Sequence, residues 1–99
     1  MSLFCIIGFN DKDTTQLREK YGALHIEHLS KLKKDGKLIA AGPLMNSESD
    51  KASASGSLLI VDFASKIEAE TWFKKDSYYL NGVYESLKVI PYIDAMDIL

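Results

Sequence analysis

The sequence predicts a single α+β domain in which a four-stranded antiparallel sheet carries two helices on one face. Two segments, 3–9 and 57–63, are apolar at both parities, which is typical of strands covered on both faces. Two other segments carry apolar residues at helical spacing behind capping residues. The elements follow in the order βαββαβ, and right-handed crossovers then place both helices on the same face. This arrangement is a ferredoxin-like sandwich.

The first strand, at 3–9, is expected to be central and to lead through a turn into a long helix. Asp13 and Gln16 have the spacing of a helix capping pair, so the helix is expected to begin there. It is expected to run to about Lys34, because the Asp-Gly pair that follows favours a left-handed cap.

A short strand at 37–41 is expected next, ended by Gly42 and Pro43. The stretch 44–56 is rich in serine and has no hydrophobic periodicity, which favours a mobile loop. At about a dozen residues it exceeds the usual hairpin connection, so it is either a lid over a site or a tolerated insertion. The segment 57–63 predicts the second central strand.

Ser65 and Glu68 form a capping box ahead of the second helix, which is expected to extend through Phe73. The last strand is expected at 84–92. It contains a lysine and a proline, and both suit an edge position because they discourage further strand pairing. Residues 94–99 have no clear pattern.

Composition limits the function classes. The chain has 99 residues and a formal net charge of -2, with 12 basic and 14 acidic residues interspersed. One domain, 1–99, is expected at this length. The absence of a basic patch argues against binding to nucleic acid or to an anionic membrane. No metal-ligand spacing and no glycine-rich phosphate-binding loop occurs, so neither a metal nor a cofactor is expected.

The pattern of the first residues predicts no targeting or membrane-spanning segment. Residues 3–9 lack a preceding basic region and a cleavage site, and they are too few to cross a bilayer. The single cysteine cannot form an intrachain disulfide, which fits a reducing compartment. We therefore expect a cytoplasmic protein.

The two-sided apolar strands also predict self-association. Two helices cover only one face of the sheet, yet the strands at 3–9 and 57–63 are apolar on both faces. A chain of this size buries only roughly 60 to 65% of its unfolded surface, so a partner subunit would add materially to its core. We expect a homodimer packed sheet on sheet, with a higher oligomer left open.

Two polar side chains fall on the predicted buried face of the first helix. Ile26, Leu29 and Leu32 define its apolar stripe at about 100° per residue. Arg18 and His25 are seven residues apart, which is nearly two turns, so they share one side of the helix. Both lie within about 40° of the stripe's centre. Either they line a cavity, or His25 bonds a backbone carbonyl and Arg18 reaches water beyond a packed stem.

His28 lies about 100° from the same stripe and is expected at its boundary or in solvent. In the second helix, Asp76 continues the apolar stripe of Ala69, Trp72 and Phe73. A carboxylate in a helix's last turn opposes the macrodipole, so a cation should compensate it, and His25 is the candidate. The alternative is that Asp76 caps the local turn through backbone contacts.

Other candidate residues carry weaker signals. Cys5 is expected to be a small core residue rather than a reactive thiolate. Ser57 follows a glycine at a strand start but lacks a nucleophile-elbow motif. Gly42 and Pro43 could leave backbone N–H groups free at a pocket rim. Four tyrosines wall either a pocket or an interface: Tyr78, Tyr79, Tyr84 and Tyr92.

Over nearly the whole chain, the sequence resembles the YciI (YCII-related) family of small bacterial proteins. The order and spacing of several short pieces carry the resemblance. They are His25 with Ile26 and Leu29, Gly36 to Leu38, Ala41 to Pro43, Gly56 with Ser57, Asp76, Tyr78, Gly82 to Tyr84, and Pro91 with Tyr92.

The resemblance implies a dimeric α+β barrel related to muconolactone isomerase, with the family's paired histidine and aspartate at His25 and Asp76. Two positions depart from the family pattern. Ser77 replaces the proline after the aspartate, and Gly22 stands where an arginine commonly precedes the histidine. Whether Arg18, one turn earlier, substitutes for that arginine is left open.

The resemblance implies an enzyme whose substrate is unknown; one branch of the family dehydrochlorinates a chlorinated aromatic, and that substrate is not carried over. The first hypothesis is a cofactor-independent enzyme that acts by proton transfer on a small aromatic or lactone-type molecule. His25 and Asp76 are its expected catalytic pair, and the expected substrate-binding residues are Arg18, Gly42, Pro43, Ser57 and Tyr78. The alternative is a noncatalytic module that binds a small molecule or a partner in the same cleft.

Overall fold

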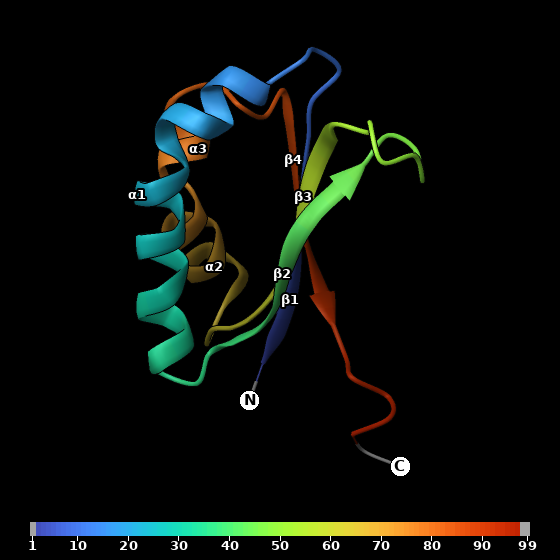
Figure 1. Cartoon of the computed structure of the whole chain (residues 1–99). Coiled ribbons are helices and arrows are strands. Elements are labelled where there is room, and N and C mark those ends of the chain that lie inside the picture. Colours follow the sequence, from blue (N-terminus) through green and yellow to red (C-terminus); the bar gives the residue numbers. More distant parts are fainter. Residues whose placement is uncertain (1, 98–99) are drawn as a thin grey trace.

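The computed structural model of the chain describes residues 2–97 and contains the expected elements with one further short helix (Figure 1). The elements are β1 (Leu3–Phe9), α1 (Thr15–Lys34), β2 (Leu38–Met45), β3 (Ala54–Asp62), α2 (Lys66–Phe73), α3 (Ser77–Leu80) and β4 (Ser86–Tyr92). Within this range, no helix is both long enough and apolar enough to cross a membrane.

The four strands form one antiparallel sheet in the order β2-β3-β1-β4. The two-sided strands β1 and β3 are central, as the sequence predicts, and β4 is an edge strand. The helices lie together on one side of the sheet and leave its other side open (Figure 1). The α+β sandwich expected from the sequence is therefore confirmed.

The core lies between the helices and the sheet. Alternate residues of β1 and β3 point toward the helices because side chains alternate along a strand. The buried apolar cluster contains Phe4, Ile6, Leu29, Leu32, Leu59, Val61, Ala69, Phe73 and Val89. The remaining residues of the central strands, including Cys5 and Ile7, are only half-buried on the open face.

Strand β2 is longer than expected. The sequence predicted that Gly42 and Pro43 end it at residue 41, but it continues to Met45, and Pro43 pairs with Ser57 of β3. Proline is tolerated because β2 is an edge strand, where its missing N–H can face solvent. The expected loop at 44–56 is correspondingly shorter and connects Met45 to Ala54.

The ends of the helices confirm two expectations and correct one. Gly36, after α1, has φ 74°, as expected for a left-handed cap. Ser65 Oγ accepts from the backbone N–H of Glu68, which is the expected cap of α2. The capping pair at the start of α1 is wrong: the cap residue is Thr14, and Asp13 Oδ1 instead accepts from the N–H and hydroxyl of Thr15. These two hydrogen bonds lower the pKa of the Asp13 carboxyl.

Candidate active site

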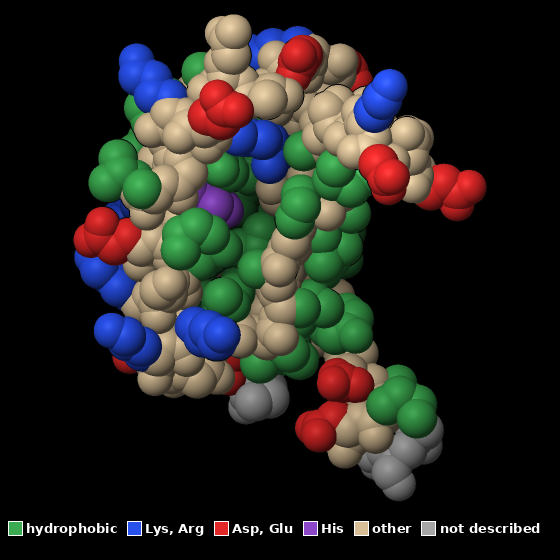
Figure 2. All heavy atoms as spheres, viewed as in Figure 1, with side chains coloured by type: hydrophobic (Ala, Val, Ile, Leu, Met, Phe, Trp, Pro, Cys, Tyr) green, Lys and Arg blue, Asp and Glu red, His purple; other side chains and the backbone are tan. Residues whose placement is uncertain are grey.

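A cavity of about 250 Å³ lies between α1, the first residues of α3 and the sheet. In the space-filling view it is a hollow with mostly apolar walls that exposes a histidine side chain (Figure 2). The residues that line it are Arg18, His25, Ile26, Leu29, Ala41, Gly42, Pro43, Ser57, Leu59 and Tyr78. All the substrate-binding residues expected from the sequence are thus brought to one cavity.

At one wall of the cavity, His25 of α1 contacts Asp76. Nδ1 of His25 lies 2.9 Å from both carboxylate oxygens of Asp76. The Asp76 side chain has no exposed surface, and His25 is 8% exposed. A fully buried carboxylate requires a charged or hydrogen-bonding partner, and His25 meets this requirement.

The position of Asp76 corrects one expectation. Helix α2 ends at Phe73, so Asp76 does not lie in its last turn. It is the cap residue of α3, and its Oδ2 accepts from the N–H of Tyr78 at 3.2 Å. A carboxylate at a helix N-terminus is favoured by the macrodipole rather than opposed. The sequence left the local cap and the contact with His25 as alternatives, and the same side chain makes both contacts.

The contact with Asp76 determines which nitrogen of His25 faces the cavity as a base. An ionised carboxylate only accepts hydrogen bonds, so Nδ1 must carry a proton. In the neutral imidazole the lone pair is then on Nε2, and Nε2 makes no hydrogen bond within the described residues. A group bound in the cavity could exchange a proton with this nitrogen.

Tyr78 fixes the plane of the His25 ring. The two rings stack with their centroids 3.9 Å apart and an interplanar angle of 8°. The Tyr78 hydroxyl donates to the backbone oxygen of Arg18 at 3.1 Å, so the phenol is held at both ends. Burial raises the pKa of Tyr78, which keeps it neutral and stacked. A Cβ at Gly22 would lie 3.3 Å from the Tyr78 hydroxyl, so glycine there leaves room for this contact.

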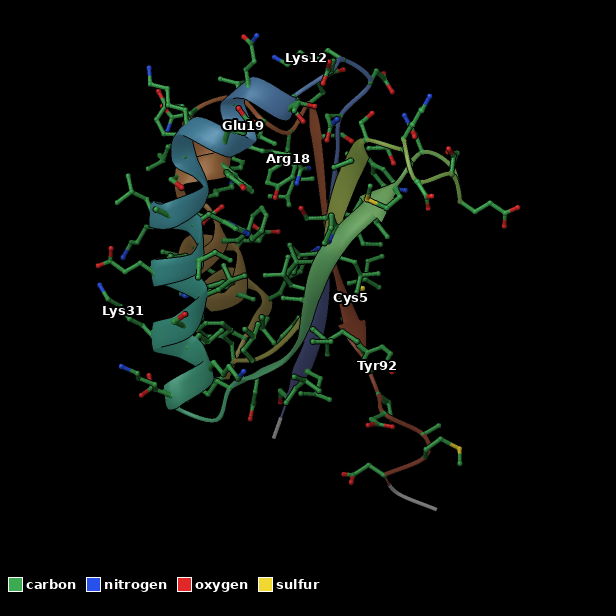
Figure 3. All side chains as sticks on the ribbon, viewed as in Figure 1. Cys5, Lys12, Arg18, Glu19, Lys31 and Tyr92 are labelled. Atoms are coloured by element: carbon green, nitrogen blue, oxygen red, sulfur yellow. The ribbon has the colours of Figure 1, made fainter. Side chains whose placement is uncertain are left out.

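Arg18 extends from α1 toward the sheet (Figure 3). Its Nε donates to Thr14 Oγ1 at 3.0 Å, and one terminal nitrogen donates to Asn10 Oδ1 and to the Gly56 carbonyl, each at 3.2 Å. The guanidinium also lies over the rings of Tyr78 and Tyr84, at 5.3 and 5.9 Å from their centroids. The arginine therefore joins the start of α1 to the end of the sheet and still lines the cavity.

Ser57 lies opposite His25's helix on β3, and its hydroxyl accepts a 2.8 Å hydrogen bond from the hydroxyl of Tyr84. The Tyr84 ring packs against Gly8, where an added Cβ would lie only 2.7 Å from ring atoms. Desolvation raises the pKa of Tyr84 to about 12, although the Ser57 hydrogen bond and Arg18 partly oppose the shift. Glycine at position 8 thus makes room for the half-buried ring of Tyr84 behind the cavity wall.

The structure corrects the buried stripe of α1. Leu29 and Leu32 are buried as expected, but Ile26 is 60% exposed and lies at the rim of the cavity. It shares the lining of the cavity with Gly42 and Pro43 of the edge strand β2. His25, not Ile26, completes the buried face.

The remaining candidates lie away from the cavity. His28 is half-buried at the boundary, as expected; its Nε2 bonds the Trp72 carbonyl at 2.9 Å, and its ring stacks on the indole. Cys5 and Tyr92 lie on the side of the sheet away from the helices (Figure 3). Burial raises the pKa of the Cys5 thiol, which disfavours a thiolate. Tyr79 packs edge-on against Phe73.

Sequence reasoning missed two contributors to the site, Asn10 and Thr14. Both are almost fully buried and accept hydrogen bonds from the Arg18 guanidinium. For Tyr84 the sequence left a pocket wall and an interface open, and the structure places its hydroxyl against Ser57. A polar residue directly after a central strand was the only available signal for Asn10. Among residues 2–97, no three His, Cys, Asp or Glu side chains converge in a way that could hold a metal ion.

Comparison with known proteins assigns the family. The model of the YCII-related domain matches residues 1–93. The chain belongs to the YCII-related family. Its similar curated proteins include Protein YciI from Escherichia coli O6:H1 and Protein YciI from Shigella flexneri. Each is 31% identical over 93 residues, which cover 91% of this chain and 95% of the relative.

A solved YCII-like structure shares the fold. It is the 5-chloro-2-hydroxyhydroquinone dehydrochlorinase (TftG) from Burkholderia phenoliruptrix AC1100, in complex with 2,5-dihydroxybenzoquinone. The TM-score is 0.84 and the sequences are 23% identical, with 96% of this chain and 97% of that chain covered. At this identity the similarity demonstrates the fold of the YCII-related chain rather than a shared substrate.

The raised pKa of Tyr84 predicts a change of stability in alkaline solution. Between pH 10 and about 12 the unfolded chain loses a phenolic proton that the folded chain retains. The stabilisation is therefore complete below pH 10 and is lost as the pH rises to about 12. We expect a spectrophotometric titration of the five tyrosines to end with a component near pH 12.

This last component should disappear in Tyr84→Phe and persist in the control Tyr79→Phe, whose ring packs away from the cavity. An unchanged final component in Tyr84→Phe would contradict the assignment.

Proposed function

We propose that this YCII-related protein is a cofactor-independent enzyme that transfers a proton at His25. One observation carries the proposal: a fully buried carboxylate contacts Nδ1 of a cavity-lining histidine at 2.9 Å. Asp76 holds the proton on Nδ1 and stabilises the imidazolium that forms when Nε2 accepts another proton. His25 is thus the general base or acid, and Asp76 orients it.

The size and walls of the cavity support a small, largely apolar substrate. A volume of about 250 Å³ is at the lower end of ligand sites, and its apolar lining suits an aromatic or lactone-type ring. TftG, which shares the fold, is named a dehydrochlorinase and holds a quinone, which supports an enzymatic use of this architecture. Isomerisation, elimination or a related lyase step would each need one well-placed proton carrier.

The proposed substrate-binding residues surround the space in front of His25. Tyr78 stacks on the imidazole and sets its plane, and Arg18 supplies positive charge at one end. Gly42 and Pro43 at the edge of β2 leave the cavity mouth uncrowded, and Ser57 offers a hydroxyl from the sheet. A well-placed acid-base group accelerates a reaction by only about 10² to 10⁴-fold. The remaining rate enhancement must come from the orientation of the substrate by these residues.

The proposal predicts proton exchange that depends on His25. We expect the protein to exchange solvent deuterium into a carbon position of at least one compound from a panel of lactone acids and hydroxylated aromatic molecules. Proton NMR in deuterium oxide measures this exchange. His25→Ala should slow it by at least about 100-fold while thermal unfolding shows a folded protein.

The matched control is His28→Ala. His28 lies on the same helix and also has a hydrogen bond and a stacked aromatic partner, but it lies outside the cavity. It should retain the exchange activity. If the panel binds by thermal shift but no compound exchanges, or if His25→Ala exchanges normally, the noncatalytic binding module is the better account.

We further propose that the open face of the sheet is covered by a second copy of the chain. Central-strand residues on this face include Cys5, which pairs with Ile60 and Ile90 in neighbouring strands. Ile90 and Tyr92 are 45% and 38% exposed in the single chain, which leaves an apolar surface uncovered. Apolar faces of this kind in small domains mark association surfaces.

We therefore expect sedimentation at micromolar concentration to give twice the 11.1 kDa chain mass. Ile90→Lys should give a folded monomer, because a charge on the paired faces would be desolvated without a partner. Ile67→Lys, at an exposed position of α2, is the control and should remain dimeric. A monomeric wild-type protein would contradict sheet-on-sheet pairing.

A further inference from the structure

A second hydrogen-bonding centre lies in the cavity, on the sheet rather than on the helix that carries His25. Ser57 of β3 lines the cavity and is only 5% exposed. Its strand neighbours are Gly8 and Pro43, and neither has a polar side chain. The only hydrogen bond of its hydroxyl within residues 2–97 is the 2.8 Å contact with Tyr84.

The direction of that hydrogen bond follows from the surroundings of Tyr84. If Ser57 donated, the phenolic proton of the half-buried Tyr84 would need another acceptor, and none bonds it within the described part of the chain. Desolvation of this phenol makes an O–H without an acceptor costly, and a phenol is the stronger acid of the two groups. Tyr84 therefore donates, and Ser57 accepts.

This direction leaves the proton of Ser57 available to the cavity. A serine hydroxyl has one donor, and here no protein acceptor within the described residues uses it. Because the residue lines the cavity and its strand neighbours are apolar, a bound molecule is the acceptor that the geometry favours. The Tyr84 ring packs on Gly8, so its hydroxyl holds the Ser57 hydroxyl in place and orients this donor.

Arg18 supplies positive charge beside Ser57. Its guanidinium bonds the carbonyl of Gly56, the preceding residue, and its other acceptors are the neutral side chains of Asn10 and Thr14. Among residues 2–97 it forms no ion pair with a carboxylate. Three of its five N–H groups are used in these bonds, so one terminal nitrogen retains two donors.

We infer that Ser57 and Arg18 form an oxyanion subsite, and that the substrate is a carbonyl compound with an acidic C–H bond next to its carbonyl group. The inference rests on the proposed function of His25. In this step Nε2 of His25 takes the proton, and the C–H electron pair forms a carbon–carbon double bond. The carbonyl π pair moves onto oxygen, where the two donors bind the negative charge.

The intermediate then completes either of two reactions without an external oxidant or reductant. In an isomerisation, His25 returns the proton to another carbon of the same molecule, and the oxygen electron pair reforms the carbonyl. In an elimination, a leaving group on the next carbon departs with its bonding pair as the carbonyl reforms. Ser57 and Arg18 contact the reacting oxygen, whereas Tyr84 acts through Ser57 as a positioning residue.

The test uses 4-nitrophenol as a ring-sized probe, because its absorbance distinguishes the phenol from the phenolate. We expect binding to the wild-type protein to lower the pKa of the probe by about one unit, which corresponds to about tenfold tighter binding of the phenolate. Ser57→Ala should remove most of this shift. Ser55→Ala is the matched control on the same strand, because its hydroxyl bonds a backbone carbonyl and it does not line the cavity.

A second variant keeps the test valid if Ser57→Ala leaves Tyr84 unpaired and unfolds the protein. The double variant Ser57→Ala, Tyr84→Phe removes both hydroxyls together and should also lose the shift, with folding checked by thermal unfolding. Three results would overturn the inference: no binding of the probe, a bound probe whose pKa is unchanged or raised, or a full shift in either variant.

The experiment separates this inference from the proposed function. His25→Ala should still lower the pKa of bound 4-nitrophenol, because the two oxyanion donors remain. Loss of exchange activity with an intact probe shift in that variant supports both proposals. If wild-type protein exchanges protons but shows no probe shift, the subsite is wrong and the role of His25 stands.

Discussion

The pairing of the buried Asp76 carboxylate with His25 is the constraint on which the site depends. Asp76 has no exposed surface, so its charge must be satisfied within the protein. It binds His25 from α1 and the N–H of Tyr78 from α3, and Tyr78 in turn stacks on His25 and bonds the backbone of α1. Removing one member of such a pair costs about 3 to 5 kcal/mol, because the other remains buried and unpaired. The contact that orients the proposed base therefore also joins the two helices.

The fold places a proposed base and a proposed hydrogen-bond donor on opposite walls of one cavity. Helix α1 carries the imidazole of His25, and strand β3 carries the hydroxyl of Ser57. Arg18 connects the helix to the sheet through its hydrogen bond to the Gly56 carbonyl. Between them lie apolar side chains and the small residues of the edge strand β2. This arrangement suits a reaction in which a proton leaves one side of a planar molecule while negative charge develops on an oxygen at its far end. Because each polar group is held by a neighbour, little reorganisation is needed when substrate binds.

Local patterns explain how much of this structure the sequence predicts. The strands β1 and β3, the end of α1 at a glycine with φ 74° and the Ser65 cap all depend on residues close in the chain. The positions of Pro43 and Ile26 depend instead on which strand lies at the edge of the sheet, and periodicity does not contain that information. Helical spacing predicted that His25 and Asp76 face the interior. It did not predict the additional helix α3, so Asp76 lies at the start of that helix rather than in the last turn of α2. The contact between Ser57 and Tyr84 joins residues that are 27 positions apart, and no local signal marks it.

The most direct test of this account is the tautomeric state of the two histidines, measured by nitrogen-15 NMR at a pH where both rings are neutral. Asp76 accepts from Nδ1 of His25, whereas the Trp72 carbonyl accepts from Nε2 of His28. The two rings should therefore carry their protons on opposite nitrogens, and His28→Gln assigns the signals. A proton on Nδ1 of His25, lost to the other nitrogen in Asp76→Ala, is the predicted result. A proton on Nε2 of His25 in the wild-type protein would contradict the account, because the base would then have no lone pair facing the cavity.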